Sequence, residues 1–292
     1  MAVLIDPPTW PAHGTVFSHL VSTSSLEELH AFAAAAGIPR RAFDEDHYDV
    51  PARWYRDLVA QGAQEVAGAD LVRALIASGL RVPARRRSSK LRAALLARWE
   101  ALLPGSPGLG GELLDRWAEA HREYHTPAHL LAVLEALDVL LEPADAALRR
   151  TVLLAAWFHD AVYQGRAGED ERASASLAVQ RLEGTMPHAA VRDVERLVLL
   201  TATHDPEPED RAGHLLCDAD LAVLAGAPED YVRYAAAIRA EYRHLPPEAF
   251  ADGRRAVLQR LLVLDPLYRT ARAQVEWTER ARGNLAQELG SL

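Results

Sequence analysis

Cysteine is almost absent from this chain of 292 residues, in which Cys217 is the only one. A single cysteine excludes an intrachain disulfide, and a reducing compartment is the simplest interpretation. No apolar run approaches the roughly 18 residues of a transmembrane helix, and the N-terminal MAVLIDPPTW lacks the basic residues of a secretory signal. We therefore expect a cytoplasmic protein with no membrane partner.

Positive charge is also in short supply, because 32 Lys and Arg residues face 41 Asp and Glu residues. The formal net charge of −9 argues against a general nucleic-acid binder, which needs a basic face for phosphates. A small anionic substrate stays compatible with this charge if metal ions or local cations set the field inside a pocket. The composition, 49% hydrophobic and 25% charged, is that of a folded globular protein.

Residues 1–83 mix strand-like and helical segments. MAVLI reads as a strand that Asp6-Pro7-Pro8 stops, and a long polar connection follows it. Ser24-Ser25 is a capping pattern before LEELHAFAAAAGI, which has helical spacing and is stopped by Gly37. We further expect an extended segment at RAFDEDHYDV, helices over 52–61 and 70–78, and a closing strand at LRVP. The sequence thus predicts a small α/β domain.

A basic stretch, ARRRSSK at residues 84–90, reads as a solvated linker. From residue 91 to 292 almost every segment has helical periodicity, and Gly and Pro residues separate the segments. This pattern predicts an all-α domain, and no internal repeat is present in the sequence. The expected helices cover 91–103, 112–120, 127–141, 144–163, 169–183, 189–203, 218–224, 228–242, 247–263 and 267–289. The fold class is therefore mainly α.

Within this helical part, LLAAWFHDAVY places His159 and Asp160 side by side among apolar residues. Burying such a pair is unfavourable by several kcal/mol unless something pairs with it. REYHTPAHLLAVLEAL adds His125 before a helix and His129 in its first turn. Each histidine taken alone is more often a structural residue than a ligand.

Two further stretches also place histidine or aspartate among apolar residues. VLLTATHDPEPED ends an apolar helix on His204, and HLLCDADLAVLAG holds Asp218 and Asp220. The ordered set H…HD…D offers two imidazole nitrogens and two carboxylates, which suits a divalent metal with positions left for water. Because neighbouring helix residues differ by about 100° in direction, one ion can meet both members of the HD pair only at a helix edge. The set comprises His129, His159, Asp160 and Asp220.

The set and its surroundings resemble the HD superfamily of metal-dependent phosphohydrolases, closest to a bacterial group of predicted HD phosphohydrolases. The resemblance rests on REYHTPAH, AAWFHDAVY, EDERASA, LTATHD, CDADLAVLAG, YAAAIRAEY, GRRAVLQRLL and ERARGNLAQEL, and it spans residues 91–292. It implies an all-helical HD bundle. It also implies that the four residues of the set are the metal ligands, with Asp218 in reserve for Asp220.

The resemblance implies further roles around the metal. YHTPAH is similar to the YHN-x-x-H stretch of cyclic-nucleotide phosphodiesterases, so His125 would contact phosphate and protonate the leaving oxygen, although Thr126 replaces Asn. Glu171 and His204 match positions near a second metal in related proteins, and a solvated first-turn role explains Glu171 equally well. Arg122 could clamp a phosphate bidentately or face water.

Residues 1–83 resemble a small bacterial domain of unknown function, through MAVLIDPPTW, LHAFAAAAGIPRRAF, DHYDVP and QGAQEV. The family supplies no mechanism. A polar cluster could form there, although turn and capping roles explain Asp49 and His47 as well. Its candidate members are His13, His19, His47, Asp49 and Arg53.

The leading functional hypothesis is hydrolysis of a small phosphate ester or nucleotide by metal-activated water, with His125 and Asp160 as catalytic residues. The cofactor would be one or two divalent ions per chain, drawn from Mn, Mg, Fe, Zn, Co and Ni. The alternatives are an HD-type di-iron oxygenase of a small organic substrate and a non-catalytic nucleotide-binding sensor. The apolar C-terminal helices would permit a homodimer, although an ordinary core accounts for them.

Overall fold

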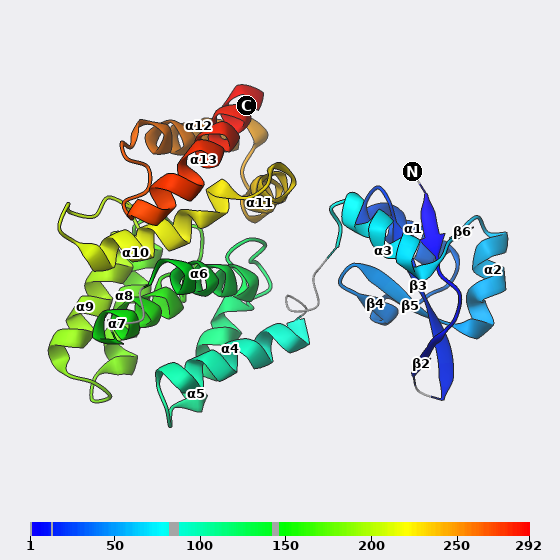
Figure 1. Cartoon of the computed structure of the whole chain (residues 1–292), viewed down its shortest axis with the longest axis horizontal. Helices are drawn as coiled ribbons and strands as arrows, with labels where there is room; N and C mark the ends of the chain where they lie inside the picture. The colour runs from blue at the N-terminus through cyan, green and yellow to red at the C-terminus, as the bar shows by residue number, and fades with distance from the viewer. Residues whose placement is uncertain (1, 13, 82–87, 142–145) are drawn as a thin grey trace. The chain divides into compact units, whose positions relative to one another are not determined.

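The computed structural model describes residues 2–12, 14–81, 88–141 and 146–292. The chain divides into two compact units, Met1–Arg87 and Ser88–Leu292, and Figure 1 shows the elements of each. The protein is mainly α-helical with a small N-terminal sheet, as predicted. Most of the expected linker, residues 84–87, lies outside the described residues, and the first helix of the second unit begins at Ser88.

The first unit is built around a mostly antiparallel sheet with strand order β4-β5-β3-β1-β6, and β2 also pairs with β3. Its strands are β1 (Val3–Ile5), β2 (Trp10–Ala12), β3 (Thr15–Ser22), β4 (Phe43–Asp44), β5 (His47–Pro51) and β6 (Gln64–Glu65). Its helices are α1 (Leu26–Ala35), α2 (Tyr55–Ala60) and α3 (Gly68–Ala77), with 3₁₀ turns η1 (Arg40–Ala42) and η2 (Ala52–Trp54). The pair β1–β6 is parallel.

The helix α1 follows the sequence prediction, because the Ser25 side chain accepts a hydrogen bond from the backbone N–H of Glu28 and so caps its start. The prediction that a long polar connection follows β1 is wrong. It contains the hairpin β2–β3, whose longer strand lies at the centre of the sheet. The predicted closing strand at LRVP does not form at Leu80 and Arg81, which belong to no strand, and residues 82 and 83 lie outside the described part. β6 pairs with β1 instead.

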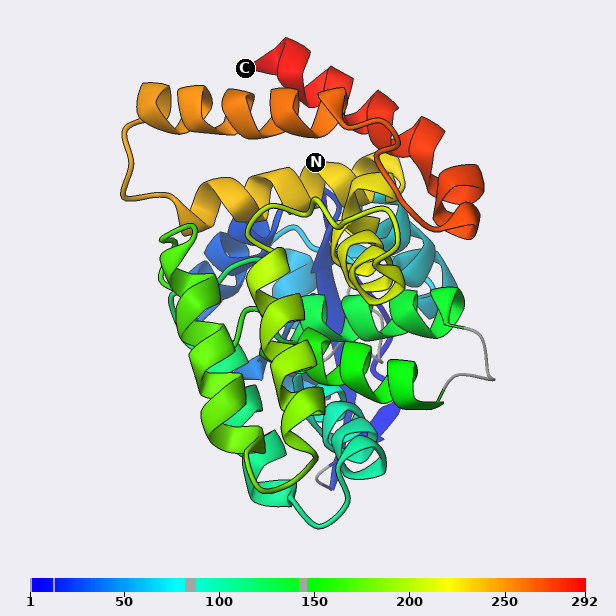
Figure 2. The same ribbon diagram turned by 90° about the vertical axis from the view of Figure 1, so that its left-hand side faces the viewer.

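The second unit is all helical. Its elements are α4 (Ser88–Leu102), α5 (Pro107–Trp117), α6 (Pro127–Leu140), α7 (Ala146–Phe158), α8 (Glu169–Leu182), α9 (His188–Leu200), α10 (Arg211–Asp220), the 3₁₀ turn η4 (Leu221–Ala225), α11 (Pro228–Glu241), α12 (Pro247–Val263) and α13 (Ala271–Ser291). The helix α8 packs on α9, and α10 packs on α6 and α7. Figure 2 shows α11, α12 and α13 gathered beyond the ends of the other helices.

Two apolar cores lie inside this unit. One core is formed by residues of α4 to α10, and the other by residues of η4 and α11 to α13. The chain passes from the first core to the second between Ala219 and Leu224, so Asp220 lies at their junction. Among the described residues, no helix has the length and hydrophobicity that crossing a bilayer requires.

Several helix boundaries differ from the prediction, among them the start of α5, which lies at Pro107 rather than at residue 112. The helix α7 ends at Phe158 rather than at residue 163, so the HD pair lies in the turn that follows it. In this turn the carbonyl oxygens of Asp160 and Ala161 accept hydrogen bonds from the buried guanidinium of Arg122. The helix α10 begins at Arg211 because Asp210 caps the backbone N–H of Gly213, and α13 begins only at Ala271.

Candidate metal centre

Four side chains converge where α6, α7 and α10 meet. His129 comes from the first turn of α6, His159 and Asp160 from the turn after α7, and Asp220 is the last residue of α10. Oδ1 of Asp220 lies 3.0 Å from Nε2 of His129 and 3.5 Å from Nε2 of His159. Oδ2 of Asp160 lies 3.2 Å from Nε2 of His159. The structure therefore brings together all four residues that the sequence analysis singled out.

The imidazole nitrogens of this cluster are oriented for ligation. Nδ1 of His159 lies 2.8 Å from the carbonyl oxygen of Ala156, so the ring donates there and Nε2 faces the cluster with its lone pair. Nε2 of His129 and Nε2 of His159 are both buried, and neither has a hydrogen-bond partner of acceptable geometry among the described residues. A buried polar atom left in this state costs about 1–3 kcal/mol.

The donor spacing fits a metal ion. Two donors bound at about 2.1 Å to one tetrahedral ion lie about 3.4 Å apart. Three separations among the four residues, 3.0, 3.5 and 3.2 Å, are close to this value, and Oδ2 of Asp160 lies 4.0 Å from Nε2 of His129. A divalent ion would satisfy both orphaned nitrogens, so the residues present fit such an ion.

Burial and mutual attraction set the protonation of the cluster. Burial raises the pKa of the Asp160 and Asp220 carboxyl groups, but the neighbouring imidazoles, above all His159, outweigh it and hold both values below the ordinary one. Burial lowers the pKa of His159, but the two carboxylates outweigh it and raise the value well above normal. For His129 burial prevails and the pKa is lowered. The paired carboxylates therefore favour positive charge at this point.

His125 lies beside the cluster and is held by Glu241, the last residue of α11. Nδ1 of His125 lies 2.7 Å from Oε2 of Glu241, while Nε2 lies 3.9 Å from Oδ2 of Asp160. The ring stacks on Tyr163 with centroids 4.1 Å apart. Burial lowers the pKa of His125, but Asp160 and Glu241 outweigh it and raise the value. His125 is thus aimed at the cluster with its remaining nitrogen.

Glu241 is a residue that the sequence analysis missed. Its Oε1 accepts the backbone N–H groups of Glu123, Tyr124 and His125, and the bond from His125 helps to lower its pKa to about 2 against the opposing effect of burial. The only sequence signal for Glu241 was its place in the block YAAAIRAEY, and the resemblance assigned no role to that position. Nothing local in the sequence connects it with a histidine 116 residues away.

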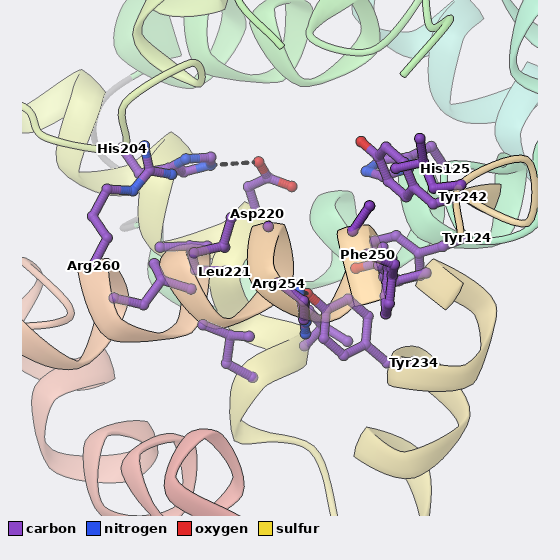
Figure 3. Close-up of a pocket in the computed structure, with 18 residues that line it drawn as sticks. Tyr124, His125, His204, Asp220, Leu221, Tyr234, Tyr242, Phe250, Arg254 and Arg260 are labelled. Atoms are coloured by element: carbon purple, nitrogen blue, oxygen red, sulfur yellow. Dashed lines mark hydrogen bonds and ion pairs between the residues drawn. The ribbon is translucent and has the colours of Figure 1, made fainter. Parts of the chain in front are cut away.

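His204 joins the cluster from a different side. It follows α9 with a left-handed backbone, φ 54°, and its Nε2 lies 2.8 Å from Oδ2 of Asp220. Figure 3 shows this pairing as a dashed line, with His125 on the opposite side of Asp220. Asp220 therefore presents one oxygen to His129 and His159 and the other to His204.

Glu171 and Asp218 lie elsewhere and have structural partners. Oε2 of Glu171 accepts the backbone N–H of Gly168 at 2.5 Å, in the first turn of α8, which matches the alternative that the sequence left open. The carboxylate of Asp218 accepts the backbone N–H groups of Arg269 and Thr270 at 2.8 and 2.7 Å, just before α13. Neither carboxylate is directed at the four-residue cluster.

Arg122 is buried and fully engaged, so the expected phosphate clamp is wrong, as is the solvent-facing alternative. Its guanidinium donates to the carbonyl oxygens of His125, Asp160 and Ala161 at 3.1, 2.7 and 3.3 Å. Its remaining N–H groups face Oε2 of Glu119 at 3.3 and 3.4 Å. These contacts use all five donors of an arginine. Arg122 therefore joins the loop of His125 to the turn of the HD pair.

A cavity of about 370 Å³ opens beside the cluster, and Figure 3 shows its lining. Its polar end consists of His125, His204 and Asp220. The rest is apolar or aromatic, with Arg260 as an exposed cation, and Arg254 is held by Glu288 at 2.7 and 2.9 Å. The aromatic lining residues are Tyr124, Tyr234, Tyr242 and Phe250. The cavity can therefore hold a small molecule with an anionic end and a planar or apolar body.

The polar cluster expected in the first unit forms in part. His19, His47 and Asp49 come together on neighbouring strands. Arg53 is exposed in η2, and His13 lies outside the described residues. Asp49 lies inside β5, paired across the sheet with β3, which contradicts its interpretation as a turn or capping residue.

The comparison with protein families gives one finding. Residues 3–78 match the family DUF4031. This family is described as a protein of unknown function, which agrees with the small N-terminal domain expected from the sequence. No HD-domain family is matched. The searches of curated proteins and of solved structures returned no match.

Proposed function

We propose that residues 88–292 form an HD-type, metal-dependent phosphohydrolase domain that cleaves a small phosphate ester or anhydride. The observation that carries the proposal is the convergence of four side chains with ligand atoms, in which two buried Nε2 atoms face carboxylates but make no hydrogen bond of acceptable geometry among the described residues. Structural histidines in a core are normally satisfied by protein donors or acceptors. The same four residues carry the resemblance to HD proteins.

The residues that would hold the ion are His129, His159, Asp160 and Asp220. Mixed nitrogen and oxygen donors favour a first-row transition ion among Mn, Fe, Co, Ni and Zn over Mg. When bound, such an ion supplies Lewis-acid activation of water and neutralises charge on the phosphoryl group. His204, which contacts the other oxygen of Asp220, extends the set toward a second ion.

The leaving oxygen would receive its proton from Nε2 of His125. Glu241 accepts the Nδ1–H bond and so fixes the orientation of the ring, and Tyr163 supports its face. General acid catalysis of this kind contributes about 10²–10⁴-fold to rate. Asp160, 3.9 Å from Nε2 of His125, would orient the attacking water with its carboxylate.

The substrate proposed from the cavity is a phosphorylated molecule with a planar body, such as a nucleotide. The phosphate would lie at the polar end, near His125 and His204, and the body against Tyr124, Tyr242 and Phe250. Aromatic side chains stack on flat groups with a gain of about 0.5–1.5 kcal/mol per pair.

The test is hydrolysis of a panel of nucleotides and generic phosphate esters by the metal-supplemented full chain. His159→Ala and Asp160→Asn should each abolish turnover and lower the metal content, while His188→Ala, an exposed histidine at the start of α9, should change neither. Activity and metal content that survive both cluster substitutions would overturn the proposal. So would nucleotide binding, seen as thermal stabilisation, without turnover of any panel member, which is the behaviour of a sensor.

A di-iron oxygenase of a small organic substrate is the second candidate. It is favoured by the contact of His204 with Asp220, which adds a nitrogen donor, and by the largely apolar cavity. Metal analysis of aerobically purified protein separates the two activities. Two irons that are lost together in His159→Ala, with an oxygen-dependent absorption spectrum, would support the oxygenase, and redox-inactive metal at the cluster would support the hydrolase.

A further inference from the structure

A second histidine and aspartate cluster lies in the first unit, on the central strands of its sheet. His19 of β3 is the register partner of Asp49 of β5. His47 lies two residues before Asp49, so both point to the same face of the strand. Cross-strand pairing therefore brings three side chains together from positions about 30 residues apart.

The donor atoms of these residues converge. Oδ1 of Asp49 lies 3.3 Å from Nε2 of His47 and 3.8 Å from Nε2 of His19. All three atoms lie within 4.8 Å of one another. Ligands of one tetrahedral ion at about 2.1 Å are about 3.4 Å apart, and the two distances to Asp49 are close to this value.

Each imidazole is also held from behind by a buried carboxylate. Nδ1 of His19 lies 2.9 Å from Oδ2 of Asp6, and Nδ1 of His47 lies 2.5 Å from Oδ1 of Asp46. Asp6 and Asp46 are 3% and 0% exposed. Metal-binding histidines usually donate their second N–H to a carboxylate, which fixes the tautomer and turns the other nitrogen toward the ion. Here that arrangement occurs twice, and both Nε2 atoms turn toward Asp49.

The supporting carboxylates are themselves fixed. Oδ1 of Asp6 accepts the backbone N–H of His19 at 2.5 Å, and Oδ2 of Asp46 accepts a guanidinium N–H of Arg81 at 3.1 Å. The cluster is therefore rigid on its buried side. It is open on the other side, where the side chain of Asp49 is 47% exposed and that of His19 is 24% exposed.

We propose that His19, His47 and Asp49 form a second metal site, which binds a divalent first-row transition ion independently of the helical unit. Two imidazoles and one carboxylate are donors of the kind that Zn, Fe(II), Co and Ni take. Three protein ligands leave coordination positions on the exposed side for water or a small ligand. This type of open site is found at catalytic centres, whereas structural zinc sites are closed by four protein ligands.

The test is titration of the full chain with Co²⁺ and Zn²⁺ in the His159→Ala background, which removes a ligand from the helical cluster. We expect that background to retain Co²⁺ binding, with ligand-field absorption bands and thermal stabilisation by the metal. His47→Ala and Asp49→Asn should each weaken the affinity by about tenfold or more and remove the bands. Asp49→Asn is the sharper variant, because it keeps the size of a side chain that is 47% exposed.

The matched control is His30→Ala in the same unit. His30 contacts the hydroxyl of Tyr48 at 3.0 Å, and Tyr48 points to the opposite face of β5 from the cluster. This variant should bind Co²⁺ as the background does. The inference is overturned if the background binds no Co²⁺, or if His47→Ala and Asp49→Asn bind it unchanged. Failure of the helical cluster to bind metal would leave the test intact, since wild type and background would then behave alike.

Discussion

Replacing Arg122 by Met removes the buried guanidinium that joins the loop of His125 to the turn after α7. The three hydrogen bonds from this charged donor to carbonyl oxygens are worth about 1.5–3 kcal/mol each. The Met side chain is uncharged, so the variant no longer bears the cost of burying a charge, which offsets the loss by about 1–4 kcal/mol. The expected net loss is about 3 kcal/mol, because the carbonyls of Asp160 and Ala161 lose their donor.

The assay is thermal unfolding followed by far-UV circular dichroism, which reports mainly on the helical unit. A loss of about 3 kcal/mol lowers Tm by about 6–12 °C in a unit of this size. Arg122→Lys should recover only part of the loss, since an ammonium has three donors and no planar fork. An Arg122→Met chain with unchanged Tm and an elevated KM for phosphate esters would refute the reasoning and restore the phosphate-binding role.

Three further outcomes follow from the packing and the carboxylates. Gly110→Ala should destabilise by about 1–3 kcal/mol in denaturant titration, because a Cβ there would overlap the indole of Trp99. Asp218→Asn should lower Tm but leave the metal content intact, whereas Asp220→Asn should lower the metal content, as elemental analysis would show. The folded protein lowers the pKa of Glu241 from 4.5 to about 2. The carboxylate therefore contributes its full stabilisation at pH values above 4.5, and this stabilisation is lost as the pH falls toward 2. The stability difference between wild type and Glu241→Gln should therefore narrow over that acid range.

Local signals explain which parts of the fold could be predicted. The start of α6 was predicted at Pro127, a residue favoured in the first helical position, and the helix begins there. The start of α1 was predicted from Ser25, which caps it. Such starts depend on side chains within a few residues, so the sequence contains the whole interaction.

The hairpin β2–β3 could not be predicted in this way. Its residues alternate imperfectly, and His19 and Ser18 look like loop residues until the partner strand β5 is known. Glu241 was missed for the same reason, since its partner His125 is distant in the sequence. The convergence of His129, His159, Asp160 and Asp220 was predictable because four unusual residues in apolar surroundings signal a cluster even when their contacts are unknown.

The end of α7 connects the fold with the candidate site. On a continuous helix, His159 and Asp160 would point about 100° apart, and one ion could meet both only at the helix edge. The helix instead ends at Phe158, where the carbonyl oxygens of Ala156 and Trp157 accept the ring N–H groups of His159 and Trp117 instead of further helical N–H groups. Both side chains are thereby free to face Asp220 and His129. The end of the helix thus lets His159 and Asp160 face one cluster, and Arg122 holds the turn that carries them through the carbonyl oxygens of Asp160 and Ala161.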